Sequence, residues 1–224
     1  MSTARWPQRL VAEALGTALL LAVVVGSGIM GERLAGGNGA IALLANTIAT
    51  GAALYALITT FGPISGAHFN PLVTLIERAE GRLCTKLMLG YVACQLVGAM
   101  IGVFAAHAMF ELPIWLPSQH IRTGPAQWFS EGVATFGLIT VIFYCVKSKS
   151  DAVPAVVGMY ITAAYWFTAS TSFANPAVTV ARSLTDTFAG IRPLDAPGFI
   201  GAQVIGAALA YALYRWMFKV KARN

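Results

Sequence analysis

Charged side chains are scarce in this sequence. Asp, Glu, Lys and Arg make up 11% of its 224 residues, against about 25% in an ordinary soluble domain. Two stretches contain none of the four, from residue 34 to 76 and from residue 152 to 181. Each is longer than the roughly 20 residues that cross the hydrocarbon core of a bilayer as one helix. This scarcity argues against a soluble domain, and each stretch is expected to cross a membrane once and then turn back.

Cysteine and histidine are also few, with three of each. Cys84, Cys94 and Cys145 lie in or beside apolar segments and form no Cys-x-x-Cys pair, which indicates packing rather than metal binding. No nucleophile beside a base can be assembled from the few polar residues. The sequence therefore predicts no enzyme, no cofactor and no metal site. The formal net charge is +6, but the basic residues are dispersed between apolar segments, which argues against a nucleic-acid partner.

Hydrophobic residues make up 57% of the chain, and they form six windows long enough to span a membrane. The windows are 9–30, 41–61, 84–109, 128–147, 153–169 and 198–218.

Two shorter segments, 70–79 and 175–186, each open with Asn-Pro. Asn is a favoured N-cap and Pro a favoured first helical residue, so a helix is expected to begin at each. Helices of this length rise about half of the roughly 30 Å hydrocarbon core. Irregular backbone at that depth is tolerated where it is buried or lines a cavity, so the two segments point to a pore or binding site.

The chain contains an internal duplication. The matching positions are Glu13 and Glu131, Thr17 and Thr135, Asn70 and Asn175, Gln95 and Gln203, and Gly98 and Gly206. Three aligned segments in one order predict a first repeat at 1–112, a connecting loop at 113–127 and a second repeat at 128–224, within one domain at 1–224. Because each repeat holds an odd number of spans, the two copies are expected to lie in opposite orientation across the membrane.

The basic residues predict which side faces the cytoplasm. One side would hold Arg5, Arg9, Arg78, Arg82, Lys86, Lys147, Lys149, Arg215, Lys219, Lys221 and Arg223; the other would hold Arg33, Arg122, Arg182 and Arg192. The positive-inside rule makes the first set cytoplasmic, together with both termini. The short tails favour a bacterial inner membrane.

The string from Ser65 to Pro71, Ser-Gly-Ala-His-Phe-Asn-Pro, a second Asn-Pro-Ala at Asn175, and the paired Glu13 and Glu131 resemble the aquaporin family, also called major intrinsic proteins. The similarity covers essentially the whole chain. It implies an all-α integral membrane fold of six tilted helices, with two re-entrant half-helices that meet at mid-membrane. It also implies homotetramers in the lipid bilayer with one pore per subunit, and passive, cofactor-free permeation of small neutral solutes.

The half-helices would place specific chemistry at the pore centre. If they enter from opposite faces, their positive dipole ends meet there and raise the energy of a cation. The amides of Asn70 and Asn175, beside Leu72 and Ala177, can each offer an N–H to a solute oxygen. The backbone carbonyls before each Asn lack a helical partner and would accept hydrogen bonds. They belong to Gly66, Ala67 and His68, and to Thr171, Ser172 and Phe173.

Four polar residues are predicted to be buried and structural. The resemblance implies that Glu13 and Glu131 accept hydrogen bonds from the re-entrant loops. Gln95 and Gln203 are expected to do similar work between helices.

Two positions depart from the family pattern. Leu72 stands where the family usually has Ala, which alters the packing between the half-helix tips. Val178 stands where the family usually has Arg, directly after the second Asn-Pro-Ala, so the outer filter loses its fixed cation. Arg182, one helical turn later, is the candidate substitute, because it could reach along the same helix face.

The family's other filter positions can be carried over by distance from the two Asn residues. The inferred selectivity filter is Thr50, Ala163, Ser172 and Val178. All four are uncharged and small or medium in size, so this filter is predicted to be wider than that of water-selective members. A register slip in the fifth span would bring Tyr165 inward and reverse the conclusion.

The sequence thus predicts a passive channel for small neutral solutes of the glycerol, urea or metalloid-hydroxide kind. Water would also pass, and protons and ions would be excluded. A water-selective aquaporin is the alternative. An inverted-repeat secondary transporter is less favoured, because no cluster of carboxylates or histidines lies between the spans to bind a coupling ion.

Overall fold

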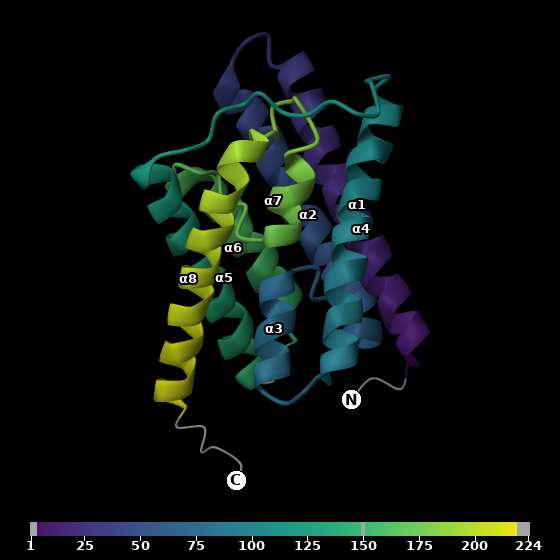
Figure 1. Ribbon diagram of the computed structural model, residues 1–224. Helices are drawn as coiled ribbons and strands as arrows, with labels where there is room; N and C mark the ends of the chain where they lie inside the picture. Colours follow the sequence, from purple (N-terminus) through teal and green to yellow (C-terminus); the bar gives the residue numbers. More distant parts are fainter. Residues whose placement is uncertain (1–3, 149–150, 219–224) are drawn as a thin grey trace.

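The computed structural model describes residues 4–148 and 151–218 (Figure 1). Lys149, Lys219, Lys221 and Arg223, which entered the charge prediction, lie outside the described residues. The elements are α1 (Trp6–Leu34), α2 (Gly39–Ser65), α3 (Pro71–Ala79), α4 (Thr85–Met109), α5 (Pro125–Lys147), α6 (Val153–Phe167), α7 (Pro176–Arg182), the 3₁₀ turn η1 (Pro193–Asp195) and α8 (Ala196–Met217). The predicted all-α fold class is confirmed, with two short helices among six longer ones.

Within the described residues, five segments are long and apolar enough to cross a membrane: α1, α2, α4, α5 and the continuous η1–α8 segment. The sixth predicted span corresponds to α6, which is apolar but has only 15 residues and so rises about 22 Å. After Phe167 the chain leaves the helix and enters the loop that precedes α7. The second half-helix, predicted at 175–186, ends four residues earlier, at Arg182.

Close helix crossings occur at equivalent places in the two halves. Helix α1 packs chiefly against α4 and α2, and α5 packs chiefly against α8. A methyl group at Gly98 would overlap the carbonyl oxygen of Ala14, and one at Gly206 would overlap the carbonyl oxygen of Gly132. Both glycines therefore allow two backbones to approach directly, as small residues commonly do between membrane helices.

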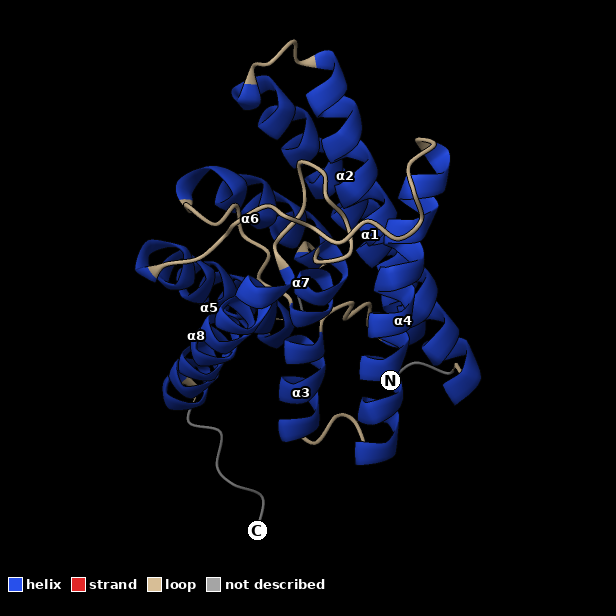
Figure 2. Ribbon diagram, turned by 45° about the horizontal axis from the view of Figure 1, so that its top comes forward, coloured by secondary structure: helices blue, strands red, loops and turns tan. Residues whose placement is uncertain are grey.

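The two half-helices occupy opposite ends of the molecule. In Figure 1, α3 lies in the lower half and α7 in the upper half, while α1 begins and α8 ends at the lower end. The segment from residue 110 to 124 crosses over the end where α7 lies (Figures 1 and 2). It is fixed there by hydrogen bonds from Ser118 N–H to the Ser183 carbonyl and from Arg192 N–H to the His120 carbonyl.

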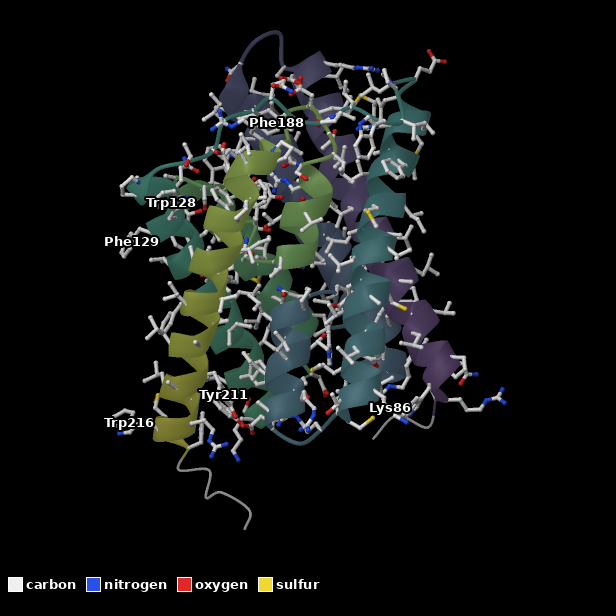
Figure 3. The ribbon with its side chains drawn as sticks, in the orientation of Figure 1. Lys86, Trp128, Phe129, Phe188, Tyr211 and Trp216 are labelled. Carbon is white, nitrogen blue, oxygen red and sulfur yellow. The ribbon has the colours of Figure 1, made fainter. Side chains whose placement is uncertain are left out.

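The outer surface is apolar, and aromatic side chains lie on it near the ends of the helices. Large hydrophobic residues are exposed on all of the long helices. Trp128 and Phe129 project outward near the start of α5, and Trp216 projects outward near the end of α8 (Figure 3). Tryptophan is enriched where membrane proteins meet the lipid–water interface. The exposed residues therefore form a surface suited to lipid rather than to water.

Candidate pore

A cavity of about 300 Å³ is bordered by four of the longer helices, α1, α2, α5 and α6, and by both half-helices. Arg182, at the end of α7, lines one end of it, and Glu77, near the end of α3, lines the other. Because α3 and α7 occupy opposite halves of the molecule (Figure 1), the cavity extends from one end toward the other. A cavity that runs in this direction, past the tips of both half-helices, is arranged as a conduit for solutes.

Asn70 and Asn175 line the cavity from the tips of the two half-helices. Asn70 Oδ1 accepts the N–H of Leu72 at 2.9 Å, and Asn175 Oδ1 accepts the N–H of Ala177 at 3.0 Å. Each amide nitrogen donates across to the opposite loop, from Asn70 to the Ala174 carbonyl at 2.8 Å and from Asn175 to the Phe69 carbonyl at 2.7 Å. A primary amide has two N–H donors. One on each Asn therefore remains for a solute.

The two loops that precede these asparagines share an unusual backbone. Gly66, Ala67 and Phe69 have φ values of 94°, 49° and 47°, and the residues 105 positions later have φ values of 60°, 53° and 48°. The latter are Thr171, Ser172 and Ala174. Five of the six are not glycine, and the left-handed region costs such residues on the order of 1–3 kcal/mol each unless the surroundings hold them. The sequence repeat is thus also a conformational repeat.

Glu13 holds the first loop. Its Oε1 accepts the Ser65 hydroxyl at 2.6 Å and the His68 N–H at 3.0 Å. Its Oε2 accepts the Phe69 N–H at 2.8 Å and the Gln95 side-chain amide at 2.8 Å. A fully buried carboxylate with four donors is well satisfied, and it fixes the strained backbone beside Asn70.

Glu131 holds the second loop in the same way. Its two oxygens accept the N–H groups of Phe173 at 2.8 Å and Ala174 at 2.9 Å, and Gln203 donates to it at 2.7 Å. Gln203 also donates to Thr179 at 2.8 Å, as Gln95 does to the matching threonine of α3. The structure therefore places all four predicted structural polar residues around the two loops.

The rest of the wall is mainly apolar. Side chains from α1, α2, α5 and α6 line it, including Leu20, Leu54, Leu138 and Val157. A solute in the cavity therefore meets amide donors and loop backbone on one side and hydrocarbon on the other.

The end of the cavity near α7 is lined by Thr50, Tyr165, Ser172 and Val178. The Tyr165 hydroxyl lies 3.3 Å from Thr50 Oγ1, within hydrogen-bonding distance. Val178 is 6% exposed and belongs to the same packed cluster as Tyr165. This end thus carries three hydroxyl groups, a branched apolar side chain and an aromatic ring.

The opposite mouth carries an ion pair. Arg82 donates to both oxygens of Glu77, at 2.6 Å from Nε and 2.7 Å from Nη2, and both residues line the cavity. The hydrogen bond that Arg82 donates to Glu77 raises the pKa of the Arg82 guanidinium above its usual value. His68 lines the same half, with Nδ1 3.1 Å from Thr74 Oγ1. The sequence prediction missed this pair, although Glu77 is the first charged residue after the long uncharged stretch.

Comparison with known proteins decides the family. The family model described as major intrinsic protein matches residues 1–172. The chain is 58% identical over 212 residues to the aquaglyceroporin AqpS of Rhizobium meliloti (strain 1021), which covers 95% of this chain and 91% of that protein. The chain belongs to the major intrinsic protein family.

More distant relatives agree with this assignment. The lens fiber major intrinsic protein of Gallus gallus is 27% identical over 232 residues, covering 100% of this chain and 86% of that protein. The crystal structure of the aquaglyceroporin from Plasmodium falciparum matches the fold with a TM-score of 0.72 at 19% identity, over 94% of this chain and 96% of that one. This major intrinsic protein is therefore a membrane channel for small neutral solutes, and not an enzyme.

Within this major intrinsic protein, four residues predicted for the pore do not line the cavity, three of them near the half-helix tips and the fourth, Ala163, in the filter. Leu72 is buried in a cluster with Ile139 and Phe143, and Ala177 is fully buried among packed side chains. Thr171 also does not line the cavity, whereas its neighbours Ser172 and Phe173 do. The substitution at Leu72 therefore affects helix packing rather than the wall of the cavity.

The filter predicted for this family member needs one correction. Ala163 is exposed on the outside of α6, and Tyr165 and Ile161 of the same helix line the cavity instead. Residues two apart lie on different sides of an α-helix. Counting back from Asn175 therefore selected the wrong residue of α6. The ring of Tyr165 occupies the place that was predicted for the methyl group of Ala163.

Proposed function

We propose that the channel passes uncharged solutes larger than water, of the glycerol, urea or metalloid-hydroxide kind, together with water, and excludes protons and ions. The observation that carries this proposal is Val178, which lines the cavity directly after the second Asn-Pro-Ala. A branched apolar side chain takes less room than a guanidinium and holds no water tightly. Val178 therefore leaves this end less polar, and leaves more room beside Tyr165, than an arginine at the same position would.

The polar part and the apolar part of the cavity wall both suit such solutes. A polyol has hydroxyl groups that can exchange water for the amides of Asn70 and Asn175, and a carbon skeleton that can lie against Leu54 and Val157. Partial desolvation is costly only for groups that find no new partner. The name of the Rhizobium meliloti relative, an aquaglyceroporin, supports the same solute class.

Water selectivity is the second candidate, and Tyr165 is the observation that favours it. Its ring lines the cavity beside Thr50 and narrows the end that the sequence predicted to be open. Glycerol would be excluded if the ring and Val178 left room for one water molecule at a time.

We further propose a homotetramer in a bacterial inner membrane, with both termini in the cytoplasm and one pore in each single-domain subunit. The start of α1 and the end of α8 lie at the same end of the molecule, as does Lys86 in the first turn of α4 (Figures 1 and 3). Arg82 lies in the loop between α3 and α4, directly before this turn. The positive-inside rule then favours the cytoplasm for this end. The apolar outer faces of the long helices leave surface for both lipid and neighbouring subunits.

Stopped-flow light scattering on proteoliposomes tests the solute proposal. Vesicles with the purified protein and empty vesicles are mixed with gradients of sucrose, glycerol, urea and arsenite. We expect faster shrinkage in sucrose and faster re-swelling with each permeant solute than in empty vesicles. Acceleration of water movement alone would contradict the proposal and select the water-specific channel.

A further inference from the structure

Arg182 is a buried cation on the wall of the conduit. It ends α7, lines the cavity and is only 2% exposed. Val178 lies four residues earlier and lines the same cavity. Residues four apart share one face of a helix, so the two side chains follow one another along the path of a solute.

The guanidinium is held by an aromatic ring and a backbone carbonyl. Its Cζ lies 3.3 Å from the centroid of the Phe173 ring, and its Nε donates to the carbonyl oxygen of Ala189. Among the described residues, Arg182 forms no ion pair, and its two terminal nitrogens have no hydrogen-bond acceptor. Four N–H donors of the guanidinium are thus left over, on a side chain that lines the cavity.

In the described part of the chain, no carboxylate pairs directly with Arg182; Glu131 attracts it only from a distance, because the Glu131 oxygens accept the N–H groups of the loop. A second guanidinium, that of Arg122, lies 5.4 Å from the centroid of the same Phe173 ring and donates to the Gly190 carbonyl. Asp195 is engaged by the side chain of Arg192 at 2.8 Å and by the Arg122 backbone N–H at 2.9 Å. A buried charge without a counter-ion costs several kcal/mol, and an ionisable residue at membrane depth is by default a functional candidate.

We propose that Arg182 is a specificity-determining residue of this channel, whose guanidinium repels cations from the conduit and donates hydrogen bonds to the oxygen of a neutral solute as it passes Val178. This inference rests on the function proposed above. The charge stands one helical turn beyond Val178 and lies over the ring of Phe173. The conduit can therefore stay wide at Val178 and still present a fixed positive charge to an entering ion.

The placement explains how cations can be excluded although position 178 carries no arginine. A neutral solute gains a charge-assisted hydrogen bond at Arg182 and then an amide hydrogen bond at Asn175. A cation meets Arg182 first and the positive ends of the half-helices next. Both barriers have the same sign, so removal of the outer one weakens the exclusion of cations without closing the path.

The test compares Arg182→Gln and Arg182→Lys with wild type in proteoliposomes. Arg192→Gln serves as the matched control, because Arg192 lies at the same end but is ion-paired to Asp195 and does not line the cavity. Two rates are measured for each protein: glycerol flux by light scattering, and proton or K⁺ leak driven by an imposed membrane potential. We expect Arg182→Gln to raise the leak by about tenfold or more, with glycerol flux within about twofold of wild type. Arg182→Lys and Arg192→Gln should keep the low leak.

A wild-type leak in Arg182→Gln with normal glycerol flux would overturn the inference. If Arg182→Gln cannot be reconstituted, Arg182→Lys decides, since it keeps the charge but loses the guanidinium that lies over the Phe173 ring. A leak in that variant with normal glycerol flux would show that anchoring of the loop, and not the charge, excludes ions. Failure of the proposed function itself would appear differently, as absent glycerol flux in the wild-type protein.

Discussion

Val178 is the side chain on which the proposed solute class depends most directly. A guanidinium introduced here would extend into a cavity of about 300 Å³ that Tyr165 and Thr50 already enter. It would also stand one turn from Arg182, and two like charges on one helix face repel. We expect Val178→Arg to reduce glycerol and urea flux by about tenfold or more, through lost width and added desolvation, while water flux falls less. Light scattering on proteoliposomes measures the ratio of the two fluxes.

The matched control for that substitution is Val178→Leu, which adds volume without charge. It should reduce glycerol flux only modestly. Equal glycerol fluxes in Val178→Arg and wild type would mean that Val178 does not border the solute path. The filter assignment would then be wrong, even if the protein proved to be a glycerol channel.

Individual pore residues were predictable where a local rule fixes them. Asn70 and Asn175 follow from the cap chemistry that starts a helix at Asn-Pro, and their positions in the cavity need only the tip of each half-helix. Tyr165 could not be placed in this way. It is separated from Asn175 by the irregular loop after Phe167, and a count through irregular backbone does not preserve the rotational position of a helix.

At the scale of elements, α7 illustrates why the end of a helix is harder to predict than its start. The apolar pattern continues past Arg182, but the N–H groups of Ser183 and Leu184 bond to the carbonyls of Val180 and Ala181. These bonds span three residues and tighten the last turn. The chain then folds back so that the Arg182 carbonyl accepts the N–H of Ile191. A tertiary contact therefore ends the helix, and no residue in the local sequence announces it.

The close crossing of α5 and α8 depends on glycine at position 206, which has no side chain. Gly206 lies against the backbone of Gly132, whereas Gly201 on the same helix has open space where a Cβ atom would lie. We expect Gly206→Leu to force α8 away from α5 and to lower the melting temperature in detergent markedly, since overpacking costs about 1–3 kcal/mol or more. Gly201→Leu should fold like wild type. Thermal unfolding followed by size-exclusion chromatography compares them, and equal melting temperatures would contradict the close crossing.

At the scale of the whole molecule, the proposed exclusion of ions depends on the opposed orientation of two similar halves. Neither half-helix spans the membrane, and each needs the other to complete the conduit, because Asn70 donates to the second loop and Asn175 to the first. The odd number of spans in each repeat was enough to predict this arrangement from the sequence. The ion pair of Glu77 and Arg82 at one mouth was not predictable, because the short turn after α3 brings the two side chains together.

The opposed arrangement makes a topological prediction that a membrane-impermeant thiol reagent can test. Cys84 lies in the turn after α3 and is exposed, and Leu194 lies beyond α7 with 82% exposure. In a background with Cys94→Ala and Cys145→Ala, Cys84 should react only when the reagent reaches the cytoplasmic face, as in inside-out vesicles. With Cys84→Ser added, Leu194→Cys should react only from the external face of intact cells. Reaction of both positions from one face would place α3 and α7 on the same side of the membrane. Two positive helix ends could then not meet at its centre, and the physical basis for excluding cations there would be lost.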